Sequence, residues 1–405
     1  MDKAVDPPRL DIDLSDPGAL PETAIEAAVD LMRSGRLFRY GEYGGDGDHA
    51  ALLEEEFAHA VGSRYCIGVN SGGSAIFIAL KSAGVGPGDK VLLNAFTLAP
   101  VPGAIDHAGA KPVFVEINES YHIDLEDLAH KAEATGAKFL LLSYMRGHVP
   151  DMDKVMATAD AIGLTVIEDC AHTMGAGWNG TLTGRFGAVG AFSAQTFKHV
   201  NSGEGGLIVT DDDDIAAKAV LYSGSYMLYA QHTARPPLEV FDRHRASIPN
   251  CSMRMSALAA ALIRPQLPTL SERAARWNLL HAALAKRLRG IDGIRIPERP
   301  QAEHYVASSL QFSLVGLDDP AIERFIGICE EAGVAIKWFG RQEPRGFTSS
   351  FADWGYVGGR QELPRTRAVL QGLCDLRIPL TLTREHCDVI AGTVQRALDM
   401  SGGDA

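Results

Sequence analysis

The chain has 405 residues, 46% of them hydrophobic, which suits a soluble globular protein with one large domain and a smaller one. Its net charge of −13, without any basic cluster, argues against a nucleic-acid-binding surface. No signal peptide is evident and no apolar run reaches membrane-spanning length, so we expect a cytoplasmic protein without a membrane partner.

The N-terminal part reads as an arm followed by a helix. Residues 1 to about 20 hold prolines among acids and predict an extended arm, and apolar residues at helical spacing predict a helix over 21–34. The glycine- and tyrosine-rich residues 36–47 predict a loop. We assign residues 1–48 to this arm and helix.

Strands and helices then alternate. The patterns predict helices over residues 50–61, 75–83 and 151–162, and strands over 65–69, 91–94, 112–117 and 139–144. This alternation is typical of an α/β domain with a mixed, mostly parallel sheet covered by helices on both faces.

Two chemically active residues follow further strand-like runs. The apolar run at 164–167 ends in Glu168-Asp169, and the run at 189–192 leads to Lys198, which has apolar neighbours. Open α/β sheets bind ligands at the carboxyl ends of their strands. Pyridoxal phosphate needs a lysine amine for its Schiff base and a carboxylate that keeps its ring nitrogen protonated. We therefore expect Lys198 and Asp169 to be catalytic.

A strand–glycine–helix segment supplies a candidate phosphate site. Its residues are Ser71, Gly72, Gly73 and Ser74. Such a turn directs backbone N–H groups and a helix N-terminus at an anion. Combined with the lysine and the acid, it predicts the cradle for the cofactor phosphate.

Other patterns carry less chemistry. The six cysteines are scattered without a C-x-x-C pair, which favours free thiols in a reducing compartment. No histidine or cysteine cluster has metal spacing, so we expect no metal. The four acids at 211–214 are interpreted as a solvated turn. The C-terminal part predicts helices over 256–267, up to about 288, and over 385–398, with strands near 306–314 and 334–338.

At these residues the sequence resembles the DegT/DnrJ/EryC1/StrS family of pyridoxal-phosphate sugar aminotransferases, which have the fold-type I aspartate aminotransferase architecture. The similar motifs follow family order at 70–72, 86–89, 109–115, 166–172, 192–198, 203–206 and 254–256. They cover roughly residues 50 to 270, and a looser match continues to the end.

The resemblance implies a large pyridoxal-phosphate-binding domain at 49–268, a smaller α+β domain at 269–405, and a homodimer with its active site at the subunit interface. Ser193 matches a phosphate-binding serine, and His172 a residue near the cofactor ring; a strand serine and a structural histidine are the alternatives. Leu98 takes the position of a ring-stacking aromatic residue. Either aliphatic packing replaces the stacking, or Phe96 has taken that role; we favour Phe96 as an ordinary core residue.

Some assignments stay open. In the family, a loop reaches the phosphate of the neighbouring subunit, and Tyr226, Asn250 or Ser252 could fill that role here. Residues 36–47 could lie near the substrate mouth or the dimer partner, or form a plain surface loop. Trp338, Phe339, Arg341 and residues 346–354 could contact substrate or simply pack.

The resemblance implies transfer of an amino group from L-glutamate or L-glutamine to a keto-sugar nucleotide or keto-cyclitol, with pyridoxamine phosphate as the intermediate form of the cofactor. One alternative is a sugar-nucleotide dehydratase. Those relatives have histidine in place of the lysine, so Lys198 argues against it, although His199 is its neighbour. A non-catalytic cofactor-binding or regulatory protein is the other alternative.

Overall fold

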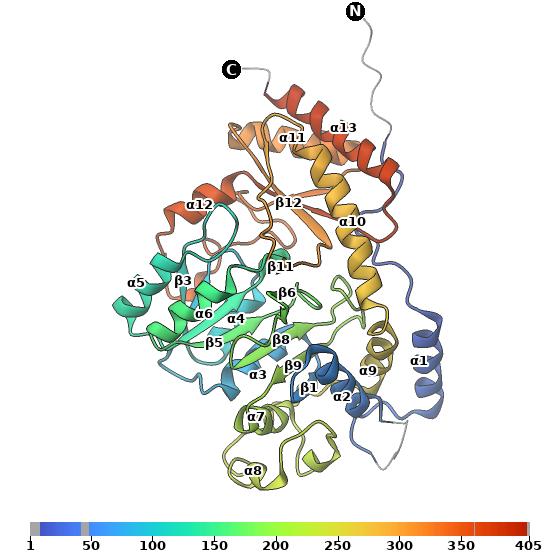
Figure 1. The fold of residues 1–405 in the computed structure, drawn as a ribbon, viewed down its shortest axis with the longest axis vertical. Coiled ribbons are helices and arrows are strands. Elements are labelled where there is room, and N and C mark those ends of the chain that lie inside the picture. Colours follow the sequence, from blue (N-terminus) through green and yellow to red (C-terminus); the bar gives the residue numbers. More distant parts are fainter. Residues whose placement is uncertain (1–8, 42–47, 360, 403–405) are drawn as a thin grey trace, which may run out of the picture.

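A computed structural model describes residues 9–41, 48–359 and 361–402. The first residues of the predicted arm, 1–8, and the end of the predicted loop, 42–47, lie outside the described residues. In Figure 1 the large sheet lies in the middle of the molecule, and the C-terminal helices lie above it around a second sheet.

The described residues contain a seven-stranded sheet with the order β1-β9-β8-β5-β4-β2-β3. Its strands are β1 (Tyr65–Val69), β2 (Lys90–Asn94), β3 (Lys111–Val115), β4 (Phe139–Ser143), β5 (Thr165–Asp169), β8 (Val189–Ser193) and β9 (Gly206–Thr210). Pairing is parallel from β3 through β8, while β9 runs antiparallel to both β8 and β1. The predicted mixed, mostly parallel sheet is confirmed.

Helices cover both faces of this sheet because its strands are apolar on both sides. Successive strand residues face opposite ways, so Leu140 and Val166 join one core while Leu141 and Ile167 join the other. The first core packs under α2 (His49–Val61), α5 (Leu125–Thr135) and α6 (Met152–Ala161). The second packs under α3 (Gly72–Ser82), α4 (Pro100–His107) and α7 (Asp213–Ser223). The helix α1 (Glu22–Ser34) packs beside α9 (Ala257–Ile263) (Figure 1).

A smaller antiparallel sheet has the order β10-β12-β14-β13. Its strands are β10 (Ile294–Arg295), β12 (Ser309–Leu314), β13 (Ile336–Trp338) and β14 (Leu373–Arg377). The helices around it are α10 (Leu270–Leu288), α11 (Asp319–Glu331) and α13 (Arg384–Ser401). A third, short sheet joins β6 (Gly177–Trp178) to β7 (Thr181–Leu182) and to β11 (Glu303–His304), so the C-terminal part also pairs with the large one.

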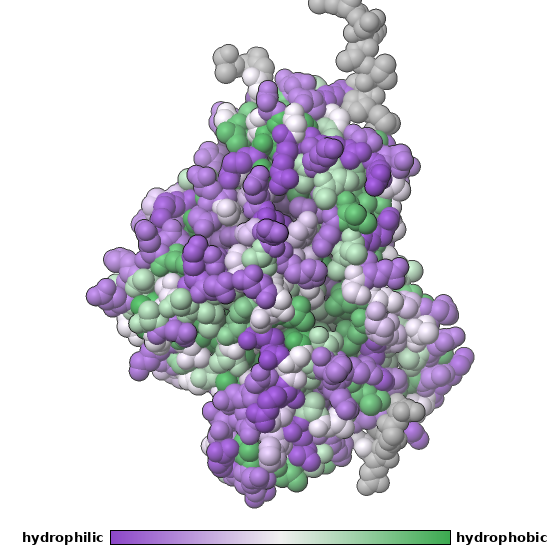
Figure 2. Space-filling model, in the orientation of Figure 1, coloured by the Kyte–Doolittle hydropathy of each residue, from purple (hydrophilic) through white to green (hydrophobic). Residues whose placement is uncertain are grey.

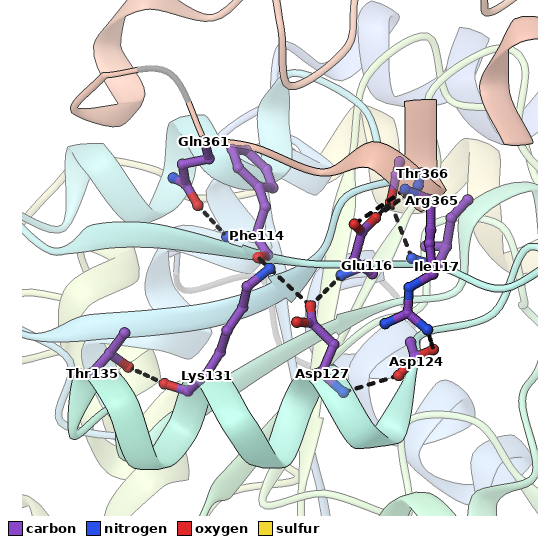
Figure 3. Close-up of polar contacts among 10 residues, drawn as sticks. All are labelled: Phe114, Glu116, Ile117, Asp124, Asp127, Lys131, Thr135, Gln361, Arg365 and Thr366. Carbon is purple, nitrogen blue, oxygen red and sulfur yellow. Dashed lines mark hydrogen bonds and ion pairs between the residues drawn. The ribbon is translucent and has the colours of Figure 1, made fainter. Parts of the chain in front are cut away.

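Glu116, just after the edge strand β3, anchors α12 (Pro364–Gln371) on the large sheet (Figure 3). Its carboxylate accepts hydrogen bonds from the backbone N–H groups of Arg365 at 3.2 Å and Thr366 at 2.7 Å, and from the Thr366 hydroxyl at 2.6 Å. Gln361 accepts from the N–H of Phe114 at 2.9 Å and donates to the carbonyl of Pro112 at 3.0 Å. The C-terminal segment therefore covers an edge strand that would otherwise be open.

Several elements differ from the sequence prediction. The acids at 211–214 begin a helix rather than forming a solvated turn: Asp212 caps α7, and Asp213 and Asp214 lie in its first turn, where carboxylates stabilise the N-terminus. The helices α4, α5, α11 and α12 and the strand β14 were not predicted.

The surface agrees with the strong charge of the chain. On the face in Figure 2, hydrophobic residues form small, separate areas among hydrophilic ones. Within the described ranges, no helix is both long enough and apolar enough to cross a bilayer.

Candidate active site

Asp169 is the last residue of β5 and is 3% exposed. It lies opposite Ser143 of β4, whose hydroxyl donates to Oδ2 at 2.6 Å. The Thr97 hydroxyl in turn donates to Ser143 Oγ at 2.8 Å, and the N–H of Ala171 donates to Asp169 Oδ1 at 3.1 Å. Burial raises the pKa of Asp169, while the hydrogen bonds from Ser143 and Ala171 work against that rise. The carboxylate is thus fixed at the carboxyl end of the sheet.

The neighbouring Glu168 faces the other side of the strand and has a structural role. Its carboxylate accepts from the Tyr144 hydroxyl at 2.6 Å and from three backbone N–H groups, those of Gly184, Phe186 and Gly187, at 2.7 to 2.8 Å. Of the two acids in this motif, Asp169 is therefore the one available to a ligand near Lys198.

Lys198 lies in the turn between β8 and β9, with its Nζ 2.7 Å from Nε2 of His172. Burial lowers the pKa of Lys198 to about 7; repulsion from Arg146 adds to this effect, and attraction by Asp169 opposes it. Burial also holds the pKa of His172 well below its usual range, so a neutral imidazole faces the amine. A large share of Lys198 is thus an unprotonated, nucleophilic amine at neutral pH.

The predicted phosphate residues meet where α3 begins. Ser71 caps the helix, and its Oγ accepts the N–H of Ser74 at 3.0 Å. A Cβ added to Gly72 would lie 2.7 Å from Cβ of Ser193, so the helix start and the end of β8 are in contact. The first N–H groups of a helix have no partner within it, which makes this end suited to an anion.

The two residues considered for the ring-contact position have different settings. Leu98 is half-buried and packs against the second core. Phe96 is 1% exposed and meets Phe339 edge-on, with ring centroids 5.1 Å apart. Phe96 is a core residue.

A group of charged residues near Lys198 was missed by the sequence analysis. Arg146 Nη2 lies 3.2 Å from Oδ2 of Asp375, and Lys337 Nζ lies 3.5 Å from the same oxygen. Arg377 donates to the carbonyl of Phe197 at 2.9 Å. Arg146 follows the predicted strand at 139–144 at the same sheet edge as Asp169, and that position was the available signal. Lys337 and Arg377 gave no local signal.

Of the residues considered for substrate contact, Phe347 lies near this site, with its ring centroid 5.8 Å from Lys337 Nζ and 6.5 Å from that of Phe197. The others pack within the fold. Trp338 and Phe339 are 2% and 3% exposed, and Arg341 forms an ion pair with Glu323 at 2.7 Å. Phe351 and Trp354 pack against Phe114, with ring centroids 6.1 and 5.9 Å away. Among the three candidate residues for contact with a partner subunit, Tyr226 is 57% exposed.

A cavity of about 40 Å³ touches Lys198, Phe197 and Arg377. A larger cavity of about 550 Å³ lies elsewhere, near Asn118, and none of the predicted site residues lines it. In the described part of the chain, no cluster of three histidine, cysteine, aspartate or glutamate side chains could hold a metal ion.

Comparison with known proteins identifies the family of the chain. The model of the DegT/DnrJ/EryC1/StrS aminotransferase family matches residues 22–395. A pleiotropic regulatory protein of Geobacillus stearothermophilus is 33% identical over 64% of this chain and 64% of its own length. A UDP-N-acetyl-3-dehydro-alpha-D-glucosamine 3-aminotransferase of Acidithiobacillus ferrooxidans is 30% identical over 67% of this chain and 70% of its own.

The fold is similar to that of a solved 3-amino-5-hydroxybenzoic acid synthase, with a TM-score of 0.80 and 23% identity over 95% of this chain and 98% of that one. The expected resemblance is confirmed over most of the sequence. The chain belongs to the DegT/DnrJ/EryC1/StrS aminotransferase family.

Proposed function

We propose that this protein uses pyridoxal phosphate to move an amino group from L-glutamate or L-glutamine to the ketone of a sugar nucleotide or a cyclitol. The observation that carries the proposal is the half-buried Lys198 amine. It lies 2.7 Å from a neutral histidine, in the field of the buried Asp169, and its pKa is lowered to about 7.

The residues present suit this cofactor. Asp169, a buried carboxylate, would pair with the protonated ring nitrogen, and Lys198 would supply the amine for the aldehyde carbon. The start of α3, from Ser71 to Ser74, and Ser193 would hold the phosphate, because the close approach of Gly72 to Ser193 brings the helix start and the end of β8 together. His172 and Leu98 would lie beside the ring. When bound, the cofactor supplies an electron sink that stabilises negative charge on the substrate carbon.

The chain's own residues supply the proton transfers and the positioning. Lys198 Nζ takes a proton as a free amine and returns it as an ammonium group, and a pKa of about 7 permits both directions near neutral pH. Thr97 and Ser143 fix Asp169 through their hydroxyl groups.

The acceptor is proposed from relatives. The Acidithiobacillus relative is named for a UDP-linked keto-sugar, which supports a sugar nucleotide. The cyclitol alternative comes from the family resemblance. The Geobacillus relative, named as a pleiotropic regulator, favours a second candidate, a cofactor-binding protein with a regulatory role.

Absorbance of the purified protein separates these functions. We expect a yellow band with pyridoxal phosphate that bleaches on addition of glutamate or glutamine and returns with a keto-sugar nucleotide or keto-cyclitol. The Lys198→Ala variant serves as the control: its absorbance should neither bleach with the donor nor return with the acceptor. A band that no donor bleaches would contradict transamination and favour the regulatory role. Bleaching only by a deoxysugar nucleotide would indicate dehydration.

We further propose a cytoplasmic homodimer. Support comes from exposed apolar residues near Arg254, whose guanidinium carbon lies 5.6 Å from the Phe38 ring centroid and 5.4 Å from that of Tyr226. Leu37 and Met227 are exposed beside them in sequence, at 40% and 63%. Light scattering should give twice the chain mass, and Met227→Glu should weaken the association.

The division into residues 1–48, 49–268 and 269–405 is also a proposal. In its favour, residues 269–405 contain every strand of the smaller sheet in the described part of the chain. Limited proteolysis should cut near 48 and 268 before it cuts within the large sheet.

A further inference from the structure

Three cationic side chains from separate segments lie near Lys198. Arg146 follows β4, Lys337 is in β13, and Arg377 ends β14. Each of them lowers the pKa of Lys198, so all three act on the same amine. The side chains form one cluster because Arg146 and Lys337 share Asp375 Oδ2, at 3.2 and 3.5 Å, and Asp375 and Arg377 lie on one strand.

The positive charge of this cluster is only partly balanced. Asp375 is the one carboxylate that forms an ion pair with these cations among the described residues, and Arg377 pairs with none. Arg146 is 8% exposed, and its buried Nε has no hydrogen-bond partner in the described structure. Burial lowers the pKa of Lys337 to about 8, with attraction by Asp375 opposing and repulsion from Arg146 adding to the shift. Buried, unbalanced charge of this kind is costly without a counter-ion.

Backbone conformation and hydrogen bonds also fix the position of the cluster. Arg146 has φ 55° and ψ 23°, in the left-handed region that a non-glycine residue rarely adopts. Gly147 follows with φ 80°, and an added Cβ there would lie 3.1 Å from the carbonyl of His172. Asp375 is held by Gln311, which donates to Oδ1 at 2.7 Å, and Gln311 is held by His148 at 2.8 Å. A left-handed backbone at a non-glycine residue such as Arg146 is enriched at functional sites.

We propose that Arg146 and Arg377, with Lys337 at the more exposed side, bind one oxyanion group of the substrate, a carboxylate or a phosphate. The proposal rests on the proposed function, because it takes the reacting carbon to lie at Lys198. It restricts the substrates to molecules that carry such a group close to that carbon. Guanidinium groups suit this role because their planar N–H groups match the oxygens of carboxylates and phosphates.

Two sources of the oxyanion are possible in this reaction: the carboxylate of the amino donor and the phosphate of a sugar-nucleotide acceptor. The cofactor phosphate is a different group, since its proposed cradle is at Ser71 and Ser193. No hydrogen bond or ion pair recorded for the described residues joins that cradle to the cluster.

Anion binding to the cofactor-loaded protein tests the proposal without turnover. We would titrate glutarate, inorganic phosphate and UDP separately by calorimetry. In Arg146→Met and Arg377→Met, we expect the dissociation constant of the bound anion to rise at least tenfold. The control, Arg287→Met, removes a surface guanidinium that pairs with Asp388 and should bind as the parent does. Binding of glutarate alone would identify the donor carboxylate, and binding of phosphate or UDP alone would identify the acceptor phosphate.

A second measurement needs no added anion and includes the conservative variant Arg146→Lys. In the apoprotein, the pH dependence of the reaction of Lys198 with an amine reagent, followed by mass spectrometry, gives the pKa of this lysine. The ionisable and charged groups that surround it are Arg146, Asp169, His172, Lys337 and Arg377. Because Arg146 repels the ammonium form, Arg146→Lys should keep the midpoint near 7, and Arg146→Met should move it upward.

The outcomes separate this proposal from the proposed function. Loss of anion binding in Arg146→Met and Arg377→Met supports the oxyanion site even when no donor bleaches the cofactor band. No binding of any of the three anions, or equal binding by parent, Arg146→Met and Arg377→Met, would overturn it even in an active aminotransferase.

Discussion

The Asp169 carboxylate is oriented by two hydroxyl groups in series, from Thr97 and Ser143. Ser143→Ala removes a hydrogen bond to a carboxylate, and such bonds contribute about 1.5–3 kcal/mol. It also removes an interaction that lowers the pKa of Asp169, so the protonated acid becomes more favourable. We expect the dissociation constant of pyridoxal phosphate to rise about tenfold or more at pH 7.5, measured by fluorescence titration of the apoprotein.

Thr97→Val is the matched control because it removes only the outer hydroxyl and leaves the bond between Ser143 and Asp169 in place. It should have a smaller effect. Unchanged affinity in Ser143→Ala would mean that the backbone contact with Ala171 is sufficient to orient Asp169.

The site residues that could be predicted from the sequence have a local signal, whereas those that were missed depend on tertiary contacts. Lys198 and Asp169 follow apolar strands, and one cofactor requires both groups, so their place in the chain suggests their chemistry. Ser143 is an ordinary residue until the parallel register places it opposite Asp169. Arg146 becomes part of a charged cluster only through its ion pair with Asp375, which lies on a strand far away in the sequence. Contacts of this kind depend on tertiary structure and leave no local pattern.

At the scale of elements, the start of α3 depends on Gly72 and not on Gly73. An added Cβ at Gly72 would lie 2.7 Å from Cβ and 2.8 Å from Oγ of Ser193, whereas at Gly73 the nearest atom is 3.9 Å away. Gly72→Ala should destabilise the apoprotein by about 1–3 kcal/mol through overpacking. Gly73→Ala should be neutral or slightly stabilising because alanine favours the helix. Urea unfolding of both variants measures the difference, and equal midpoints would contradict the close contact with Ser193.

The helix α12 depends on Glu116 in a comparable way (Figure 3). Glu116→Gln replaces the charged acceptor of two backbone N–H groups and the Thr366 hydroxyl, which should cost about 1.5–3 kcal/mol. Hydrogen exchange should accelerate over residues 361–371. The exposed Glu119 gives the control: Glu119→Gln should change stability by less than about 0.5 kcal/mol. If residues 361–371 exchange at the same rate in both variants, the hydrogen bonds to Glu116 do not hold this segment.

The elements that the sequence did not predict have polar residues that contact other parts of the molecule, and these residues interrupt the apolar pattern. In β14, Asp375 and Arg377 interrupt an apolar strand because they reach the charged cluster near Lys198. The helix α12 has few apolar residues, since it is held at its start by Glu116. Helices α2 and α6, whose apolar faces meet the core directly, were predicted to within a residue or two.

For the whole molecule, the alternation of strands and helices was sufficient to predict a mixed, mostly parallel sheet. It was not sufficient to predict the order of the strands. The antiparallel pairs of β9 with β1 and β8, and the return of the C-terminal segment to β3, join residues far apart in sequence. The family resemblance supplied the overall architecture that periodicity left open.

Acid stability is a property of the whole molecule, because burial lowers the pKa of histidines in both parts of the fold. Four buried histidines have a lowered pKa: His199 and His281 (each to about 3), His148 and His232. The pKa is also lowered at the half-buried His122 (to about 4) and His172. Below pH 6.5 the unfolded chain binds protons at these side chains that the native state does not bind. The free energy of unfolding is therefore unaffected by these histidines above pH 6.5. It decreases as the pH falls from 6.5 toward the pKa values that the histidines have in the native state. Each such proton lowers the free energy of unfolding by about 1.4 kcal/mol per pH unit.

We expect the urea midpoint to fall between pH 7 and pH 5, and the raised pKa values of Asp169, Glu168 and Glu303 to oppose this fall in part. His281→Gln removes one buried histidine and should make the slope shallower by up to about 1.4 kcal/mol per pH unit. His130→Gln changes an exposed histidine and should leave the slope as it is. A midpoint that is flat over this range would mean that the native state takes up these protons as readily as the unfolded chain. The histidines would then be open to water in solution.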